Sequence, residues 1–569
     1  MKRKRLIVIL VVVAGISFSI LALKTPRLSS DSVLLMEIGG DIPEAPPAWS
    51  PIMALIEKPL PIMLDKIMAL RKAKVDSHVK AVVLKITPCS FGLAKAQELR
   101  DAINDYRESK KPIAAYLEGG GNLEYYIACA CEDVYIAESS MLGLNGLASR
   151  SIFLGGIWEK IYVDMEVDKI KEYKSAGDML GAKDMSPELR EMLDSLLDSE
   201  YEQLLSGIAE ARGMDKSEVE GIVDELYMFP DKYLEAGLVD GIKYLDEVLE
   251  EFKSSGNSKA KVVTEKEYAK IEPSRLGINR GPKVAVVYGV GNIVTGDPGG
   301  QPFSGDVMGS DRMVKELKKV AEDDSVKAVI FRIDSGGGSA LASDLIWRAT
   351  QRIREKKPFV VSMSDVAGSG GYYIACGADK IVAQPGTITG SIGVLTSHLG
   401  LGRLLKKIGV NTVTLSRGRF GDYGDWTRSL TPGERDKTRS WIQEIYEMFT
   451  GKVSQGRGLS KDQVKEIGRG RVWTGAQAKG IGLIDETGGI MTAVKLVKEN
   501  LGVPEDKDVK LVYKRPPMTM WQFILGRGSD VFMQTLLTKD EQEFLKYSRS
   551  MSLYREHEPL FLMPTIRIQ

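Results

Sequence analysis

Short apolar runs alternate with amphipathic segments along most of this chain. The runs VKAVIF, PFVVSM and KIVA have the length of buried strands, and residues 340–356 show the apolar spacing of a helix. Strands that alternate with helices are typical of βαβ crossovers, which build a mostly parallel sheet. The pattern therefore predicts an α/β fold.

The first residues show a different pattern. Residues 6–23 form an uncharged apolar run, and the basic sequence MKRKR precedes it. A helix of 18 residues spans about 27 Å, enough to cross a hydrocarbon core. A cleaved signal peptide would have a shorter apolar run and a small-residue cleavage site. We therefore expect a retained N-terminal transmembrane helix, with its basic end in the cytoplasm and the rest of the chain across the membrane.

The chain also contains an internal repeat. KAVVLKI at residues 80–86 resembles KAVIFRI at residues 327–333, and YYIAC at residues 125–129 recurs unchanged at residues 372–376. Both pairs are offset by 247 residues. Repeats of this kind indicate two copies of one structural unit, so we expect a tandem duplication.

The repeat divides the chain into five parts. We expect a basic stub and membrane anchor at 1–28, an N-terminal repeat at 29–252, a linker at 253–282, a C-terminal repeat at 283–500, and a tail at 501–569.

Composition excludes several classes of protein. The chain has 77 basic and 77 acidic residues, and 43% of its residues are hydrophobic, so it is globular rather than disordered. No basic run follows the first five residues, and we expect no nucleic-acid binding. The cysteines form neither a disulfide framework nor a tetrahedral zinc pattern, so we expect no metal and no cofactor. They are Cys89, Cys129, Cys131 and Cys376.

Two glycine clusters in the second repeat follow predicted strands. Residues 334–339 read DSGGGS, and residues 368–371 read GSGG at the start of a helix. Glycine turns expose backbone N–H groups, as in a phosphate loop or an oxyanion hole, but the G-K-[ST] ending of a phosphate loop is missing. Tight packing is the alternative. The first repeat has Asn122 where the second has Ser369, so the contrast favours chemistry confined to the second repeat.

A nucleophilic serine at position 369 needs a base. The chain has three histidines, and His398, which follows Ser369 by 29 residues, is the candidate among them. A lysine could serve instead, if burial lowers its pKa toward neutrality. The residues alone leave both kinds of base open, and they predict a serine acyl-transfer site.

Three motifs together resemble a known family. They are SGGGSALASDLI, GSGGYYIACGADKIVAQPGTITGSIGV and, in the first repeat, YKSAGDMLGAKDMSPELREM. In this order they are similar to the signal peptide peptidase A (protease IV) family of serine-lysine proteases, in its long, duplicated form. The resemblance covers nearly the whole chain after the predicted anchor. It implies two copies of the crotonase and caseinolytic-protease fold, assembled as a bowl-shaped homotetramer.

The resemblance also implies the catalytic residues. Ser369 would be the nucleophile and Lys174, in the Y-K-S-A motif, would be the general base. Ser391, in T-G-S-I-G, would orient the lysine amine. Because the serine and the lysine come from different repeats, the site would be assembled at the boundary between them.

The oxyanion hole would use the backbone N–H groups of Gly338 and Gly370. Here the sequence departs from the family, because the usual N-S-P-G-G turn reads D-S-G-G-G at residues 334–338. Glycine in place of proline loosens the turn by about 1 kcal/mol of backbone entropy. Gly337 is therefore an alternative to Gly338.

The implied function is that of a membrane-anchored serine endopeptidase without a cofactor. Its expected partners are apolar peptides such as cleaved signal-peptide remnants, the lipid around its anchor, and other copies of the chain. We expect it in the bacterial inner membrane, with its catalytic body on the periplasmic side. Two alternative functions are that of a non-catalytic membrane scaffold and that of an acyl-thioester enzyme of the crotonase fold.

Overall fold

The computed structural model describes residues 28, 31–46, 61–254, 260–297, 307–513, 558–564, 566 and 568. The predicted membrane anchor at residues 6–23 lies outside these residues. Within the described residues, no helix combines the length and the apolar character needed to span a bilayer.

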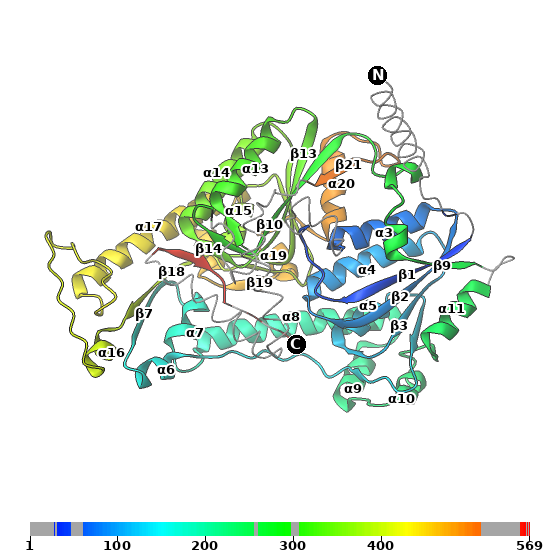
Figure 1. The fold of residues 1–569 in the computed structure, drawn as a ribbon, viewed down its shortest axis with the longest axis horizontal. Coiled ribbons are helices and arrows are strands. Elements are labelled where there is room, and N and C mark those ends of the chain that lie inside the picture. The colour runs from blue at the N-terminus through cyan, green and yellow to red at the C-terminus, as the bar shows by residue number, and fades with distance from the viewer. Residues whose placement is uncertain are drawn as a thin grey trace, which may run out of the picture.

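The first half of the chain forms a parallel sheet with helices on both faces (Figure 1). Its strand order is β8 (Gly241–Ile242), β5 (Asp133–Ile136), β3 (Ile113–Leu117), β2 (Val79–Cys89), β1 (Ser32–Gly40) and β9 (Lys261–Thr264). The central strands are buried on both faces, which explains their almost continuously apolar sequence. One face packs on α3 (Met63–Val75), α4 (Leu93–Arg107) and α5 (Asn122–Ala128), and the other on α11 (Leu245–Ser254).

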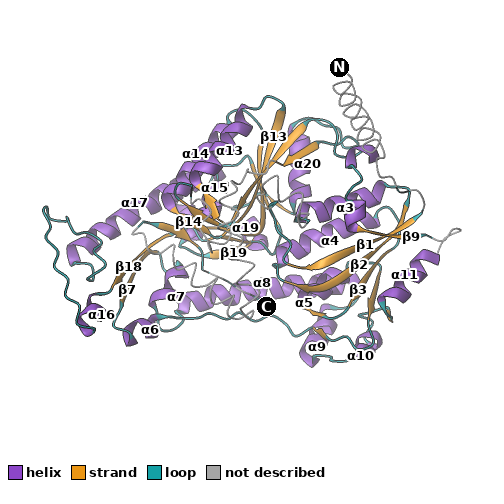
Figure 2. Ribbon diagram, viewed as in Figure 1, coloured by secondary structure: helices purple, strands orange, loops and turns teal. Residues whose placement is uncertain are grey.

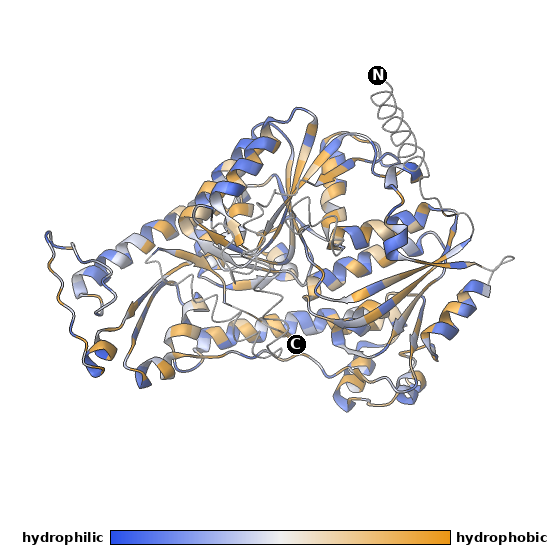
Figure 3. Ribbon diagram, viewed as in Figure 1, coloured by the Kyte–Doolittle hydropathy of each residue, from blue (hydrophilic) through white to orange (hydrophobic). Residues whose placement is uncertain are grey.

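The second half repeats this arrangement. Its sheet contains, in order, β20 (Glu486–Thr487), β16 (Lys380–Ala383), β15 (Phe359–Gly368), β13 (Val326–Ser335), β10 (Lys283–Val290) and β21 (Lys510–Tyr513). The order of equivalent strands is the same in both sheets. Helix α14 (Ala340–Arg354) lies 247 residues after α4 and has the same length. Figure 3 shows the apolar residues of both halves concentrated on the sheets and on the helix faces that cover them.

Two long helices also correspond between the halves, α8 (Pro187–Arg212) and α17 (Pro432–Arg457). Each begins with a hydroxyl N-cap followed by proline, and each ends at a glycine in the left-handed conformation, which is the expected arrangement of helix stop and start signals. Helix α8 contacts α5 in the first half and β19 (Val472–Thr474) in the second. It therefore ties the two halves together along one side (Figure 2).

A third sheet joins segments that lie far apart in the sequence. Its order is β12 (Val307–Gly309), β11 (Asn292–Val294), β14 (Gly337–Ser339), β22 (Leu560–Leu562), β18 (Val394–Gly400) and β7 (Asp164–Ile170). Strand β7 comes from the first half and pairs antiparallel with β18 of the second half along its whole length. Strand β22, drawn in red in Figure 1, comes from the C-terminal tail.

Parts of the predicted linker and tail belong to the sheets. Strand β9, within residues 253–282, pairs with β1, and strand β21, within residues 501–569, pairs with β10. Both are short edge strands of four residues. Such segments carry too little alternation to be distinguished from loops in a sequence.

A buried network of charges lies between the halves. Arg332 of β13 is 1% exposed and contacts the carboxylates of Glu44 and Glu98, both from the first half, and the hydroxyl of Ser362. Burial alone would raise the pKa of Glu44, but the charge and hydrogen bonds of Arg332 lower it to about 2. The arginine therefore places the nearest positive charge beside two buried carboxylates.

We predict that Arg332→Met weakens the whole body. The substitution removes the nearest cation from two buried carboxylates, and breaking a buried pair in this way typically costs about 3–5 kcal/mol. Urea unfolding should therefore begin at a much lower concentration. The matched control is Lys85→Met, because Lys85 occupies the same position in the first copy and pairs with Glu118 near the surface. That pair contributes at most about 1 kcal/mol. Equal unfolding midpoints for the two variants would contradict the role of Arg332.

Candidate active site

Ser369 lies on a sharp turn between strand β15 and helix α15 (Gly370–Ala375). Its φ is 51° and its ψ is −110°, a conformation that is costly for a residue with a side chain. The turn is held because the Ser369 amide donates to the Gly390 carbonyl at 2.8 Å. A Cβ at Gly371 would lie 2.4 Å from the carbonyl oxygen of Ser335, so the last glycine of G-S-G-G is required by the close approach of the two turns.

Lys174 reaches Ser369 from the other half of the molecule. It follows β7 after a short turn, and its Nζ lies 2.7 Å from Ser369 Oγ. The same amine donates to the carbonyl oxygen of Ser391 at 2.8 Å and lies 3.0 Å from Ser391 Oγ. The structure thus brings together the three side chains that the resemblance implied.

The environment of Lys174 favours its neutral form. The side chain is fully buried, and burial lowers the pKa of the Lys174 amine well below its ordinary value. In the described part of the chain, its amine has hydroxyl and carbonyl partners but no carboxylate to stabilise the ammonium form. A neutral amine at this position has a lone pair that can accept a proton from Ser369.

Glycines on the second half make room for the lysine. A Cβ at Gly470 would lie 2.7 Å from Lys174 Cα, and one at Gly393 would lie 3.0 Å from Lys174 Cδ. The chain next to the lysine is fixed as well, because the Tyr173 amide donates to the Arg469 carbonyl at 3.1 Å. The second glycine of T-G-S-I-G therefore has a packing role against the lysine stem.

The glycine turn at residues 335–338 packs directly against the Ser369 turn. A Cβ at Gly337 would lie 2.7 Å from the Gly370 amide nitrogen, and one at Gly370 would lie 3.2 Å from the Gly338 amide nitrogen. The Gly337 amide itself donates to Ser335 Oγ at 3.2 Å. The amides of Gly338 and Gly370 therefore lie close together beside Ser369.

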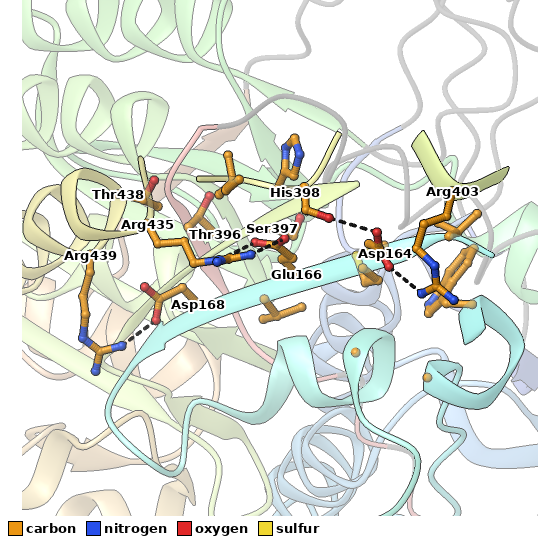
Figure 4. Close-up of a pocket in the computed structure, with 18 of the residues that line it drawn as sticks. Asp164, Glu166, Asp168, Thr396, Ser397, His398, Arg403, Arg435, Thr438 and Arg439 are labelled. Atoms are coloured by element: carbon orange, nitrogen blue, oxygen red, sulfur yellow. Dashed lines mark hydrogen bonds and ion pairs between the residues drawn. The ribbon is translucent and has the colours of Figure 1, made fainter. Parts of the chain in front are cut away.

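Ion pairs anchor the strand that carries the lysine. Alternate acidic residues on one face of β7 each contact an arginine of the second half at 2.8–2.9 Å, and the pairs are Asp164 with Arg403, Glu166 with Arg435, and Asp168 with Arg439. Figure 4 shows these pairs in a cavity lined by residues of β7 and β18. Neither Ser369 nor Lys174 lines that cavity, so its charges hold β7 without reaching the buried lysine.

His398 lines this cavity, as Ser369 and Lys174 do not. It is on β18 opposite Glu166, and its Nε2 is 2.8 Å from the carbonyl oxygen of Arg428. The Ser369 hydroxyl is hydrogen-bonded to Lys174 instead. Of the two kinds of base that the residues left open, the geometry favours the lysine.

A second set of contacts near Ser369 was not predicted from the sequence. Asp365, on the same strand, accepts hydrogen bonds from the amides of Gly92 and Lys95 at the start of α4, and so caps a helix of the first half. The amine of Lys95 lies 3.5 Å from Asp334, and burial raises the pKa of Asp334 to about 7. Comparison of the two repeats could have indicated these contacts, since the first copy has Thr87 where the second has Asp334.

We predict that the backbone strain at Ser369 can be measured as stability. The free energy of unfolding of Ser369→Gly should exceed that of Ser369→Ala by about 1 kcal/mol, because glycine adopts positive φ without cost. Ser369→Gly should therefore unfold at a higher temperature. The matched control is Asn122, the equivalent residue of the first copy, which begins α5 without a positive φ. Here alanine should be at least as stable as glycine. If the alanine variant is at least as stable as the glycine variant at position 369 as well, Ser369 carries no backbone strain.

Known proteins are similar to this chain over most of its length. The model of peptidase family S49 matches residues 105–259 and 351–504. The chain is similar to the chloroplastic serine protease SPPA of Arabidopsis thaliana, with 37% identity over 81% of this chain and 69% of the relative. It is also similar to Protease 4 of Haemophilus influenzae, with 29% identity over 88% of this chain and 84% of the relative.

Solved structures match more distantly. A mutant of the 1510-N membrane-bound stomatin-specific protease matches at 17% identity and a TM-score of 0.27, over 42% of this chain and 100% of that protein. ClpP1 from Listeria monocytogenes matches at 16% identity and a TM-score of 0.22, over 36% of this chain and 89% of that one.

Proposed function

The chain belongs to peptidase family S49 and is a serine peptidase, and we propose that it cleaves peptide bonds with a dyad of Ser369 and Lys174. The observation that supports this proposal is the 2.7 Å contact between Lys174 Nζ and Ser369 Oγ, both of which are fully buried. A buried lysine with a lowered pKa, paired with a serine on a strained turn, is the arrangement that an activated nucleophile requires.

In the proposed mechanism Lys174 acts first as a base and then as an acid. Its neutral amine takes the Ser369 proton while Oγ attacks the carbonyl carbon of the substrate. The resulting ammonium group then protonates the leaving amine, and an acyl-enzyme remains on Ser369. Water, deprotonated by the same amine, hydrolyses this ester and regenerates the serine. Ser391 keeps the amine directed at Ser369 throughout, through its carbonyl and hydroxyl oxygens.

The developing oxyanion would be stabilised by the amides of Gly338 and Gly370. Two neighbouring N–H groups, one of them at the start of α15, suit a negative charge that forms only in the transition state. Because the Gly337 amide already donates to Ser335, Gly338 is the better candidate of the two glycines.

We further propose that the substrates are apolar peptides at a membrane surface, such as signal-peptide remnants. Small and aliphatic side chains lie beside the dyad, among them Ala176, two residues after the lysine, and Leu395 on β18. The apolar run at residues 6–23 would anchor the body to a bacterial inner membrane, on its outer side.

The two rival functions fit the site less well. A non-catalytic scaffold would have no reason to bury a lysine against Ser369, since burying an unpaired amine costs free energy. An acyl-thioester enzyme of the crotonase fold would need the oxyanion glycines but no nucleophilic serine. The two copies would each have that fold in our proposal, with the serine placed on the turn between β15 and α15.

We predict that both members of the dyad are essential for hydrolysis of a short apolar fluorogenic peptide. Ser369→Ala, Lys174→Met and Lys174→Arg should each reduce kcat/KM by at least about a thousandfold, because the members of such a unit act together and a guanidinium group stays protonated. A fluorophosphonate probe should label Ser369 in the native chain. His398→Ala is the control and should keep most activity. Full activity of Ser369→Ala, or loss of activity only in His398→Ala, would refute the dyad.

A further inference from the structure

A short loop before β19, residues 469–471, supports the backbone on two sides of the proposed dyad. The Arg469 carbonyl accepts a hydrogen bond from the Tyr173 amide at 3.1 Å, and the Arg471 carbonyl accepts one from the Ser391 amide at 2.7 Å. Tyr173 directly precedes the proposed base, and Ser391 contacts its amine. One loop of the second half therefore holds both the base and the serine that directs it.

The backbone of this loop has an unusual conformation. Arg469 and Gly470 both have positive φ, 48° and 80°. A residue with a side chain adopts this conformation at a cost in free energy. A Cβ on Gly470 would lie 2.7 Å from Lys174 Cα, so the loop must keep this shape to admit the lysine. We therefore examine the side chains that hold it.

The aromatic ring of Tyr173 lies against two arginines of the loop. The guanidinium carbon of Arg471 is 5.0 Å from the centre of the Tyr173 ring and 4.7 Å from that of the Trp473 ring. The guanidinium carbon of Arg469 is 5.4 Å from the Tyr173 ring. Cations at these distances are attracted to the face of an aromatic ring. The side chain next to the proposed base is thus held by the same loop as its amide.

A carboxylate from the first half completes this cluster. Glu191 lies near the start of α8, the helix that contacts β19. One oxygen of its carboxylate is 2.6 Å from Arg471 Nη1, and the other accepts a hydrogen bond from the Tyr173 hydroxyl at 2.8 Å. The hydrogen bonds from Arg471 and Tyr173 lower the pKa of the Glu191 carboxyl. We call Tyr173, Glu191 and Arg471 the outer clamp.

The outer clamp is better suited to positioning than to stabilising the fold. The Glu191 side chain is 58% exposed, and ion pairs at such a surface contribute little to the free energy of unfolding. Catalysis is far more sensitive to geometry, because a displacement of about 1 Å can lower a rate about a hundredfold. The 2.7 Å contact between Lys174 Nζ and Ser369 Oγ leaves little room for such a displacement.

We propose that Arg471 and Glu191 are positioning residues of the dyad. They fix Tyr173 and the backbone of Ser391, and thereby the distance between the lysine amine and the serine hydroxyl. Both act through these neighbours rather than on the substrate. This inference rests on the proposed function, because positioning changes a rate only if the dyad cleaves peptides.

Loss of the outer clamp should slow catalysis and leave substrate binding nearly unchanged. In the full chain, Arg471→Met and Glu191→Ala should each lower kcat for a short apolar peptide about tenfold, with KM changed less than about twofold. Glu191→Gln should keep more of the native kcat than Glu191→Ala, because its amide oxygen can still accept the hydrogen bond of the Tyr173 hydroxyl. Native kcat in both Arg471→Met and Glu191→Ala would overturn the proposal.

Arg212→Met is the matched control. Arg212 lies at the opposite end of α8, pairs with Asp240 at 2.9 Å, and has a side chain that is 10% exposed, against 16% for Arg471. This variant should change neither kcat nor KM. An equal loss of kcat in Arg212→Met and Arg471→Met would show a general effect of removing a paired arginine, and would contradict a specific role of the outer clamp.

The double variant tests whether the two residues act as one unit. Arg471→Met combined with Glu191→Ala should lower kcat little more than either substitution alone, since each already opens the same cluster. Multiplied single effects would show independent roles and would contradict the outer clamp. A loss of kcat that is matched by an equal fall in the fraction of folded chain, measured by urea unfolding, would assign the pair to stability and overturn the proposal.

A measurement without substrate separates this inference from the proposed function. Burial lowers the pKa of the Lys174 amine, so a displaced lysine should have a pKa closer to the ordinary value. NMR of the ¹³Cε-labelled chain should show this rise in Arg471→Met and not in Arg212→Met. The rise supports the outer clamp even if no hydrolysis is found. Hydrolysis that requires Lys174, with kcat and this pKa unchanged in Arg471→Met, would support the function and refute the outer clamp.

Discussion

The contact between Lys174 and Ser369 is the constraint on which the rest of the structure depends, because it joins a lysine of one copy to a serine of the other. Neither group is placed by its own copy alone. The pairing of β7 with β18 carries the lysine across the boundary, and the strained turn after β15 presents the serine to it. Gly393 and Gly470 are required because the lysine stem passes directly against their backbone.

Two buried basic residues lie at the boundary between the copies, and their surroundings have opposite effects on their charge. Arg332 is paired with Glu44 and Glu98, so the charged forms of the arginine and Glu44 are stabilised and the two sheets are held together. Lys174 is equally buried but has only hydroxyl and carbonyl partners in the described chain, so its charged form is disfavoured. Paired charges give the boundary its stability, and the unpaired lysine gives it chemistry. The acidic residues of β7 pair with arginines and not with Lys174, so they anchor the strand without stabilising the charged form of the lysine.

The sequence predicted the α/β class and the repeat because short apolar strands and the 247-residue offset are local patterns. It predicted Ser369 from the contrast with Asn122. It could not choose Lys174 from the residues alone, since the pKa of a lysine depends on burial, which only the tertiary structure determines; the resemblance to a family singled it out. Asp365 was missed because it caps a helix 270 residues away along the chain. Strand β22 has only three residues and shows no periodicity, so its pairing beside the glycine turn could not be read from the sequence.

The central claim is that Lys174 is neutral when the enzyme works, and it is tested most directly by titrating that amine. NMR of the full chain with ¹³Cε-labelled lysine would give its pKa, with the signal assigned by its loss in Lys174→Met. Because burial lowers the pKa of this amine, its signal should change from ammonium to amine well below the value of about 10.4 for an exposed lysine. Peptide hydrolysis should be lost as the pH falls through the same pKa, since the ammonium form cannot accept the Ser369 proton. A Lys174 signal that stays in the ammonium form up to about pH 10, in an enzyme that is active at neutral pH, would contradict the account.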